Sequence, residues 1–229
     1  MSKIDVAEFF QTVQDKHATR QATEHSYRPA LEKLLKSINP SLTVINEPKQ
    51  ITDIGKPDFV IMRDDVPVGY VEAKDVGLDI RKMKGANKDQ HIRYVEGLPN
   101  LIYTNGLDFD FYRWDASGEP SRVASVTIGD YLMGLQPNTT QFPVLEDLLY
   151  DFVAQDRQAL TITSASRLAK IMARKGRLMR HSFGEALISD RDNQSDLAAQ
   201  YLAFQDSLCL LYTSPSPRDQ RGSRMPSSA

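Results

Sequence analysis

The chain has 229 residues, of which 41% are hydrophobic and 25% charged, values typical of one well-cored globular domain with an extension, or of two small domains. The net charge of -2 gives no overall sign of a polyanionic partner, so any surface that binds nucleic acid has to be local. A single cysteine, Cys209, excludes a disulfide framework and a cysteine-based zinc site, and fits a reducing cytoplasm.

The first half of the chain predicts two helices followed by a region rich in strands. Apolar residues recur at helical spacing over 6–13 and 27–38, and the second helix is expected to end at Asn39-Pro40. Short strands are expected over 42–47, 100–104 and 107–114, and 58–63 with 67–74 predict a hairpin. A helix is expected over 79–96, irregular at Gly85.

From Ile128 onward the sequence predicts helices, at 131–135, 142–155, 166–180 and 195–208. The last residues, rich in Ser, Pro and Arg, can bury little and predict a disordered tail. This ending also resembles translated sequencing-adaptor sequence, in which case the natural chain diverges near Leu208. No apolar run approaches the about 20 residues needed to span a bilayer, and the N-terminus lacks the apolar core of a signal peptide. We therefore expect a cytoplasmic protein with no membrane contact.

Three charged residues stand at the ends of the two apolar strands of the hairpin. Asp58 opens the first strand, whereas Glu72 and Lys74 close the second. Because strand side chains alternate between faces, Glu72 and Lys74 point the same way. A hairpin paired symmetrically about Asp65 places Asp58 opposite Glu72, with the Cβ atoms about 4.5–5.5 Å apart.

Two carboxylates at that separation favour a shared divalent cation, because their repulsion otherwise raises the pKa of at least one of them. Mg²⁺ suits the pair, since it prefers oxygen ligands and keeps several waters beside one or two carboxylates. Lys74 is placed to activate a water or to neutralise charge on a phosphate. The alternative is that Asp58 caps a turn and that Glu72 and Lys74 lie on a solvated strand edge. The apolar residues on both faces of the first strand argue against this alternative.

These motifs, in this order, resemble the PD-(D/E)XK nucleases. "PDF" is followed by "VEAK" within the order helix, three strands, helix, two strands, and "QHIRY" resembles the QxxxY element of a subset of these nucleases. More closely, "TEHSYRPALEKLL", "GKPDFV", "GYVEAKDVG" and "RYVEGLPNLIYTN" resemble the N-terminal nuclease domain of type ISP and type IIG restriction–modification enzymes. The resemblance covers roughly residues 20–206.

The resemblance implies roles for individual residues. Asp58 and Glu72 are implied to be metal ligands, and Lys74 the catalytic lysine. Such nucleases often add a glutamate from the first core helix, for which Glu24 and Glu32 both qualify; Glu24 is favoured because it lies in the resembling block.

Gln90 and Tyr94 are implied to support the site or to contact the phosphate backbone. The alternative for them is an ordinary exposed glutamine and a half-buried tyrosine on a helix. In the resembling enzymes an N6-adenine DNA methyltransferase follows, and in type ISP also a helicase-like motor. S-adenosylmethionine and ATP are implied only for such downstream domains, because nothing in this chain resembles their motifs.

Two basic stretches predict contacts with DNA phosphates. The first, directly after the strand that carries Glu72 and Lys74, holds Arg81, Lys82, Lys84, Lys88 and Arg93. The second is an amphipathic helix on which Arg167, Lys170, Arg174 and Arg177 recur at helical spacing. For this helix, docking to a following domain and a merely solvated face are the alternatives.

The sequence thus predicts an α/β restriction-endonuclease-like core, with a mixed sheet flanked by helices, followed by an all-helical extension. The expected divisions are a nuclease core over 1–135, a helical coupler over 136–206 and a disordered or artefactual tail over 207–229. The expected function is Mg²⁺-dependent hydrolysis of phosphodiester bonds in unmodified double-stranded DNA, within a restriction–modification enzyme. The alternatives are a repair or recombination nuclease of the same fold, and a non-cleaving DNA-binding module.

Overall fold

The computed structural model describes residues 5–64, 66–115, 118–154 and 165–189, together with 199, 200 and 203. The chain divides into two units, 1–177 and 178–229, and helix α5 (Ala165–Ser189) contributes to both. The helix expected over 195–208 and the tail expected over 207–229 lie outside the described ranges, except for three helical positions. Within those ranges, no helix is both long and apolar enough to cross a membrane.

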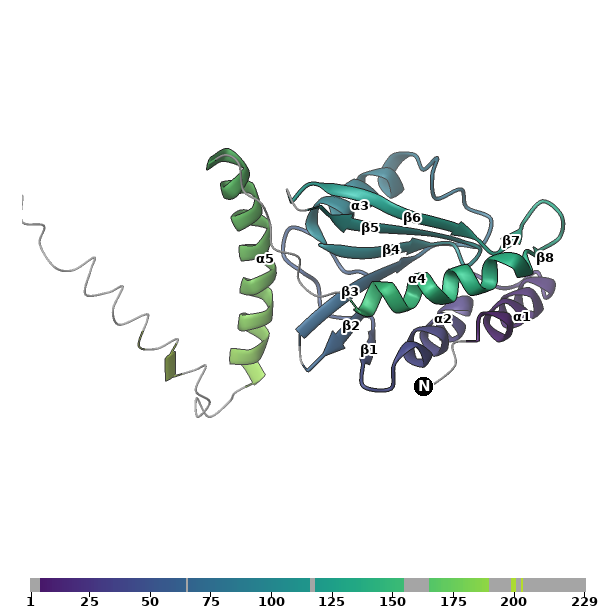
Figure 1. Ribbon diagram of the computed structural model, residues 1–229, viewed down its shortest axis with the longest axis horizontal. Coiled ribbons are helices and arrows are strands. Elements are labelled where there is room, and N and C mark those ends of the chain that lie inside the picture. The colour runs from purple at the N-terminus through teal and green to yellow at the C-terminus, as the bar shows by residue number, and fades with distance from the viewer. Residues whose placement is uncertain are drawn as a thin grey trace, which may run out of the picture. The chain divides into compact units, whose positions relative to one another are not determined.

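A mixed six-stranded sheet forms the centre of the first unit (Figure 1). Its order follows the chain: β1 (Thr43–Asn46), β2 (Phe59–Arg63), β3 (Val66–Ala73), β4 (Asn100–Thr104), β5 (Asp108–Trp114) and β6 (Pro120–Thr127). All neighbours pair antiparallel except β3 and β4, which are parallel and joined through α3 (Gly85–Gly97). The predicted α/β class with a mixed sheet is therefore confirmed.

Helices cover both faces of this sheet. On one face, α1 (Val6–Ala18), α2 (Glu24–Ile38) and α4 (Phe142–Ala154) enclose the main hydrophobic core with alternate residues of the strands. Phe9 of α1 packs edge-on against Phe109, and Phe152 of α4 against Phe111. On the other face, the His91 ring of α3 packs against Tyr103. The central strands are thus buried on both sides, which explains their continuous apolar runs.

The helix boundaries follow from local signals in the sequence. The Asp5 side chain accepts a hydrogen bond from the Glu8 N–H and caps α1. The Thr23 N–H donates to Ser26 Oγ at the start of α2, and α2 ends at Ile38, directly before Asn39-Pro40, as predicted. Helix α3 begins at Gly85, whose φ of 55° suits glycine, so the helix expected from residue 79 starts six residues later.

The hairpin of β2 and β3 departs from symmetric pairing near its turn. Phe59 pairs with Val71 and Ile61 with Gly69, which is the expected register, but a bulge after Ile61 shifts the remaining pairs by one residue. The predicted symmetry about Asp65 is therefore wrong at the turn and correct at the end that carries the charged residues. The bulge lies between Ile61 and Met62, so the pairs next to the site keep the expected register.

Several expectations after residue 114 are wrong. Strand β6 was not predicted, because its exposed, serine-containing sequence gives little apolar alternation. Residues 131–135 are not a helix but the turn between two short paired strands, β7 (Gly129–Asp130) and β8 (Gln136–Pro137). A 3-10 turn, η1 (Thr139–Gln141), then leads into α4. The core also continues past residue 135, because Leu145, Leu149 and Phe152 of α4 are part of it.

Close packing of α4 on β3 depends on a glycine, which gives a test of this arrangement. A Cβ on Gly69 would lie 2.3 Å from Cε1 of the buried Phe152 ring. We expect Gly69→Ala to lower the free energy of unfolding by about 1–3 kcal/mol, measured by urea denaturation. The control is Gly176→Ala in α5, where nothing lies within 4 Å, and which should be neutral or stabilising by up to about 1 kcal/mol. Unchanged stability of Gly69→Ala would contradict the packing of α4 against β3.

Candidate active site

The charged trio of Asp58, Glu72 and Lys74 meets where β3 ends, in the middle of the sheet. Glu72 and Lys74 project to the same side of β3, and extension of the β2–β3 register by one residue places Asp58 opposite Glu72. Glu72 is 2% exposed and Asp58 is 8% exposed. Two carboxylates are therefore buried side by side, which is unfavourable unless cations or hydrogen-bond donors surround them.

Glu72 has one oxygen that is satisfied and one that is not. Its Oε1 accepts hydrogen bonds from Lys74 Nζ at 2.7 Å and from Gln90 Nε2 at 2.9 Å. Its Oε2 is buried and has no hydrogen-bond partner among the described residues. A buried carboxylate oxygen without a partner is costly, and such groups in folded proteins call for a ligand, an ion or water.

Lys74 is fixed by several contacts at once. Its Nζ donates to Glu72 Oε1 and to Gln90 Oε1, both at 2.7 Å, and lies 5.8 Å from the centre of the Tyr103 ring. Its backbone N–H donates to the Thr104 carbonyl, which extends the β3–β4 ladder by one bond. The ammonium group is consequently held over the carboxylates instead of extending into solvent.

Gln90 and Tyr94 both lie beside the trio, and Gln90 is only partly exposed. Gln90 bridges Glu72 and Lys74, and its Nε2 also lies 3.4 Å from the Tyr94 hydroxyl. Tyr94 is 2% exposed, and its ring packs against Gly55, whose φ of 129° is open to glycine. The i, i+4 spacing on α3 therefore delivers an amide to the carboxylates and a buried ring behind it.

Asp58 has both carboxylate oxygens engaged. Its Oδ2 accepts the Ala73 N–H at 2.8 Å, and its Oδ1 lies 2.5 Å from Arg28 Nη2. Arg28 is itself 9% exposed and comes from α2, on the opposite layer from α3. The site thus joins residues at the start of β2 and the end of β3 with residues of α2 and α3.

Arg28 links Asp58 to two further glutamates. Its Nη2 donates to Glu24 Oε1 at 2.7 Å and its Nη1 to Glu47 Oε1 at 3.3 Å. Glu24, the favoured glutamate of the first helix, is thus brought to the site through Arg28, whereas Glu32 pairs with Lys36 elsewhere on α2. Arg28 and Glu47 were missed by the sequence analysis. The signal for Arg28 is an arginine four residues after Glu24, next to Tyr27 on the buried side of the helix.

The burial of Asp58 and Glu72 next to each other raises the pKa of both carboxyl groups. Burial raises the pKa of Glu72 from 4.5 to about 7, and the negative charge of Asp58 adds to the effect while Lys74 opposes it. Burial also raises the pKa of Asp58, against the lowering effects of the Ala73 N–H and of Arg28. In the absence of a cation, the protonated form of Glu72 is therefore favoured up to near-neutral pH.

The donor set fits Mg²⁺ better than zinc. Within the described ranges, no group of three or more His, Cys, Asp or Glu side chains is placed to hold a metal ion. A cation here would depend on Asp58, Glu72 and water, which is the kind of set that Mg²⁺ accepts and that structural or catalytic zinc does not. The unpartnered Oε2 of Glu72 is the atom that fits a cation ligand.

The basic residues near α3 differ in whether they bind the protein itself. Arg81 is bound by its Nε and Nη2 to the fully buried Asp110 at 2.9–3.3 Å, together with Arg122, so its main role is to hold the segment before α3 to the sheet. Arg93 donates to the Ile54 carbonyl at 2.7 Å. All five are exposed, but among the residues that the structure describes Lys84 and Lys88 are not tied to the sheet in this way, and Lys82 lies 3.6 Å from Asp79.

The basic helix expected over 166–180 is present as α5 and extends to Ser189. Arg177 on it is partly exposed. The side chains of Arg167, Lys170 and Arg174 lie outside the described part of the structure, so their contact with DNA stays a prediction.

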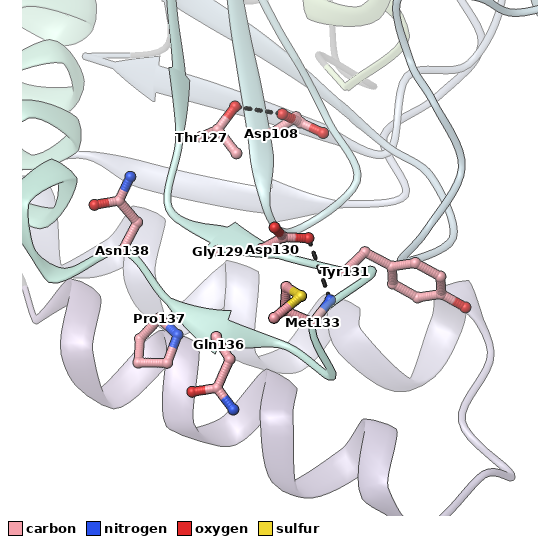
Figure 2. Close-up of a pocket in the computed structure, with 9 residues that line it drawn as sticks. All are labelled: Asp108, Thr127, Gly129, Asp130, Tyr131, Met133, Gln136, Pro137 and Asn138. Carbon is pink, nitrogen blue, oxygen red and sulfur yellow. Dashed lines mark hydrogen bonds between the residues drawn. The ribbon is translucent and has the colours of Figure 1, made fainter.

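Of two hollows in the described part of the surface, only the smaller one reaches residues of the site. A narrow crevice of about 10 Å³, lined in part by Glu24, Arg28 and Lys74, has room for about one water. A larger hollow of about 560 Å³ lies around β7 and β8 and shares no lining residue with it (Figure 2). Its carboxylates are engaged locally: Asp108 accepts from Thr127 Oγ1, and Asp130 accepts from the Met133 N–H at 3.3 Å. The larger hollow therefore does not supply the chemistry of the trio.

Comparison with known proteins adds one structural similarity. No protein-family model matches the sequence, and no curated protein matches it. Among solved structures, the chain is similar to a chain in a cryo-EM structure of a DrdV–DNA complex, with 20% sequence identity and a TM-score of 0.48. The match covers 65% of this chain and 96% of that chain. At this identity and TM-score, no residue role is carried from one chain to the other.

The raised pKa of Glu72 predicts a pH-dependent cost to the metal-free fold. The unfolded chain releases the Glu72 proton near pH 4.5, whereas the folded chain retains it to about pH 7, so stability from this group is lost as pH rises between these values. In the presence of a chelator at pH 8, Glu72→Gln should be more stable than the wild type by about 1–3 kcal/mol in urea denaturation. At pH 4.5 the difference should disappear.

The matched control is Glu96→Gln on α3, an exposed glutamate that should show no such dependence. A Glu72→Gln variant that is destabilised equally at pH 8 and pH 4.5 would contradict the assigned cost of the buried charge.

Proposed function

We propose that this chain is a Mg²⁺-dependent DNA endonuclease domain of the PD-(D/E)XK kind, acting within a restriction–modification enzyme. The observation that carries the proposal is the buried arrangement of Asp58, Glu72 and Lys74 around a carboxylate oxygen that has no partner in the described part of the chain. A module that only binds DNA gains nothing from burying two carboxylates beside a lysine, because the burial costs stability. The resemblance of the sequence motifs to these nucleases supports the same function.

Each residue has a distinct task in the proposed reaction. Asp58 and Glu72 would hold Mg²⁺, which supplies charge neutralisation at the phosphate and a more acidic water. Lys74 is directed by Glu72 and Gln90, so its ammonium group is placed to stabilise negative charge on the phosphate or to orient the attacking water. Gln90 holds Lys74 and Glu72 in place through a hydrogen bond with each, and the Tyr94 hydroxyl in turn contacts Gln90.

The partner of the site is proposed to be unmodified double-stranded DNA, with the methyltransferase, and in the type ISP case a motor, in the same polypeptide. Lys84 and Lys88 on or next to the first turn of α3 are exposed on the helix that delivers Gln90. Phosphates held by these lysines would be positioned on the side of the sheet from which Lys74 and Glu72 project. This placement favours a nuclease acting on a backbone over hydrolysis of a small phosphate ester.

Cleavage tests the proposal directly. Glu72→Ala should abolish Mg²⁺-dependent cutting of an unmethylated plasmid while DNA affinity in a gel-shift assay stays within about twofold, because the basic surface remains. Lys74→Ala should still bind Mg²⁺ but lose most of the cutting. The matched control is Glu96→Ala, which removes an exposed glutamate of α3 outside the site. Cutting by Glu72→Ala at the wild-type rate would rule out the site.

The salt dependence of DNA binding tests the proposed surface. Each phosphate contact contributes about 0.9 to the slope of log K against log salt. Replacement of Lys84 and Lys88 by Ala should therefore flatten the slope by about 1.8 and weaken binding regardless of sequence. The same experiment on Lys170 and Arg174 tests whether α5 contacts DNA. An equal loss of slope would show that it does, and an unchanged slope would favour docking to another domain or a solvated face.

A further inference from the structure

Arg28 makes the most unusual contact near the trio, and the proposed reaction leaves it without a task. An arginine on the apolar side of a helix is expected to extend to the surface, but Arg28 is only 9% exposed. It contacts three carboxylates from three parts of the chain, namely Glu24, Glu47 and Asp58. The shortest of the three contacts, at 2.5 Å, is the one to Asp58.

The contact with Asp58 uses the oxygen that a cation would need. The other oxygen of Asp58 already accepts the Ala73 N–H, which belongs to the end of β3 and cannot turn away. Oδ1 is therefore the oxygen of Asp58 that a cation shared with Glu72 would approach. A guanidinium and a divalent cation on one carboxylate oxygen repel each other strongly in a buried site, where screening by water is weak.

If a cation displaced Arg28 from Asp58, Arg28 would still have Glu24 and Glu47 as partners. The same Nη2 group also contacts Glu24, and Nη1 contacts Glu47, which is 55% exposed at its side chain. A rotation of the guanidinium away from Asp58 can thus keep both glutamates. Release does not leave an isolated buried charge, which is the outcome that would make it prohibitive.

We propose that Arg28 is the internal counter-cation of the metal-free site: it neutralises Asp58 when no metal is bound, and competes with the metal for Oδ1. This inference rests on the proposed function, because it assumes that Asp58 and Glu72 are cation ligands. Arg28 acts as a positioning residue. It neutralises one of the two facing carboxylates in the metal-free fold and sets a threshold of cation concentration for filling the site.

Replacement of Arg28 is expected to raise the cation affinity and to lower the stability of the metal-free fold, and these opposite signs separate this role from a merely structural one. Arg28→Gln should bind Mn²⁺ or Mg²⁺ about five- to tenfold more tightly in calorimetry of the 229-residue chain, since the competing charge is gone. Its melting temperature in a chelator should fall by about 2–6 °C, because Asp58, Glu24 and Glu47 lose their shared cation. An arginine that only supports the fold would lower both quantities when replaced.

Two variants serve as controls. Lys56→Gln removes a positive charge from the same network, 3.4 Å from Glu47 and with no contact to Asp58, and should change the cation affinity by less than about twofold. Arg28→Lys keeps the charge and should stay closer to the wild type than Arg28→Gln. In the unmodified protein, NMR of ¹⁵N-labelled arginine provides a readout that needs no variant: the Arg28 signal should shift with the same midpoint as the calorimetric titration.

The possible outcomes are distinct. Cation binding by the wild type that is lost in Glu72→Ala, with unchanged or weaker affinity in Arg28→Gln and a static Arg28 signal, overturns the role of Arg28 and leaves the proposed function standing. Absence of cation binding by both the wild type and Arg28→Gln overturns both. Binding by Arg28→Gln alone, or tighter binding by it, supports the competition.

Discussion

Two carboxylates buried against each other at the end of β3 impose the constraint that organises this molecule. Neither Asp58 nor Glu72 can be tolerated in such surroundings without compensation, and each layer of the fold supplies part of it. The sheet provides a backbone N–H and the ammonium group of Lys74, α3 provides the amide of Gln90, and α2 provides the guanidinium of Arg28. The positions of α2 and α3 on opposite faces are thus coupled electrostatically at one point.

This stabilisation is incomplete, because one oxygen of Glu72 lacks a hydrogen-bond donor among the described residues. Asp58 has a donor for each oxygen, whereas Glu72 has two donors on one oxygen and none on the other among the described residues. The pKa of Glu72 near 7 expresses the same imbalance as a preference for the neutral form. A site built for stability alone would satisfy both oxygens or replace the pair with apolar residues, and this residual cost is what the proposed function explains.

The sequence predicted what depends on periodicity and on short motifs. Strands β1 to β5, helices α1 to α4 and the alignment of Asp58 with Glu72 follow from alternation, helical spacing and a hairpin register that is correct next to the site. It did not predict β6, whose outward side chains are mostly polar, nor the exposure of Leu132 and Met133, which follow an apolar pattern yet lie on a turn. Arg28 was missed for a related reason: its burial depends on Asp58, 30 positions later, which no local pattern reports.

Strand β6 has a consequence for the behaviour of the protein in concentrated solution. As the last strand of the sheet, it leaves a row of backbone N–H and C=O groups unpaired within the sheet, the arrangement on which strands of other molecules can assemble. Two features oppose this. The register of β5 and β6 shifts between Phe111 and Tyr112, which bends the edge, and Arg122 places a charge on it that is tied to Asp110. Asp110 thus binds both Arg81, which holds the segment leading to α3, and Arg122, a charged residue of the kind that disfavours edge-to-edge pairing.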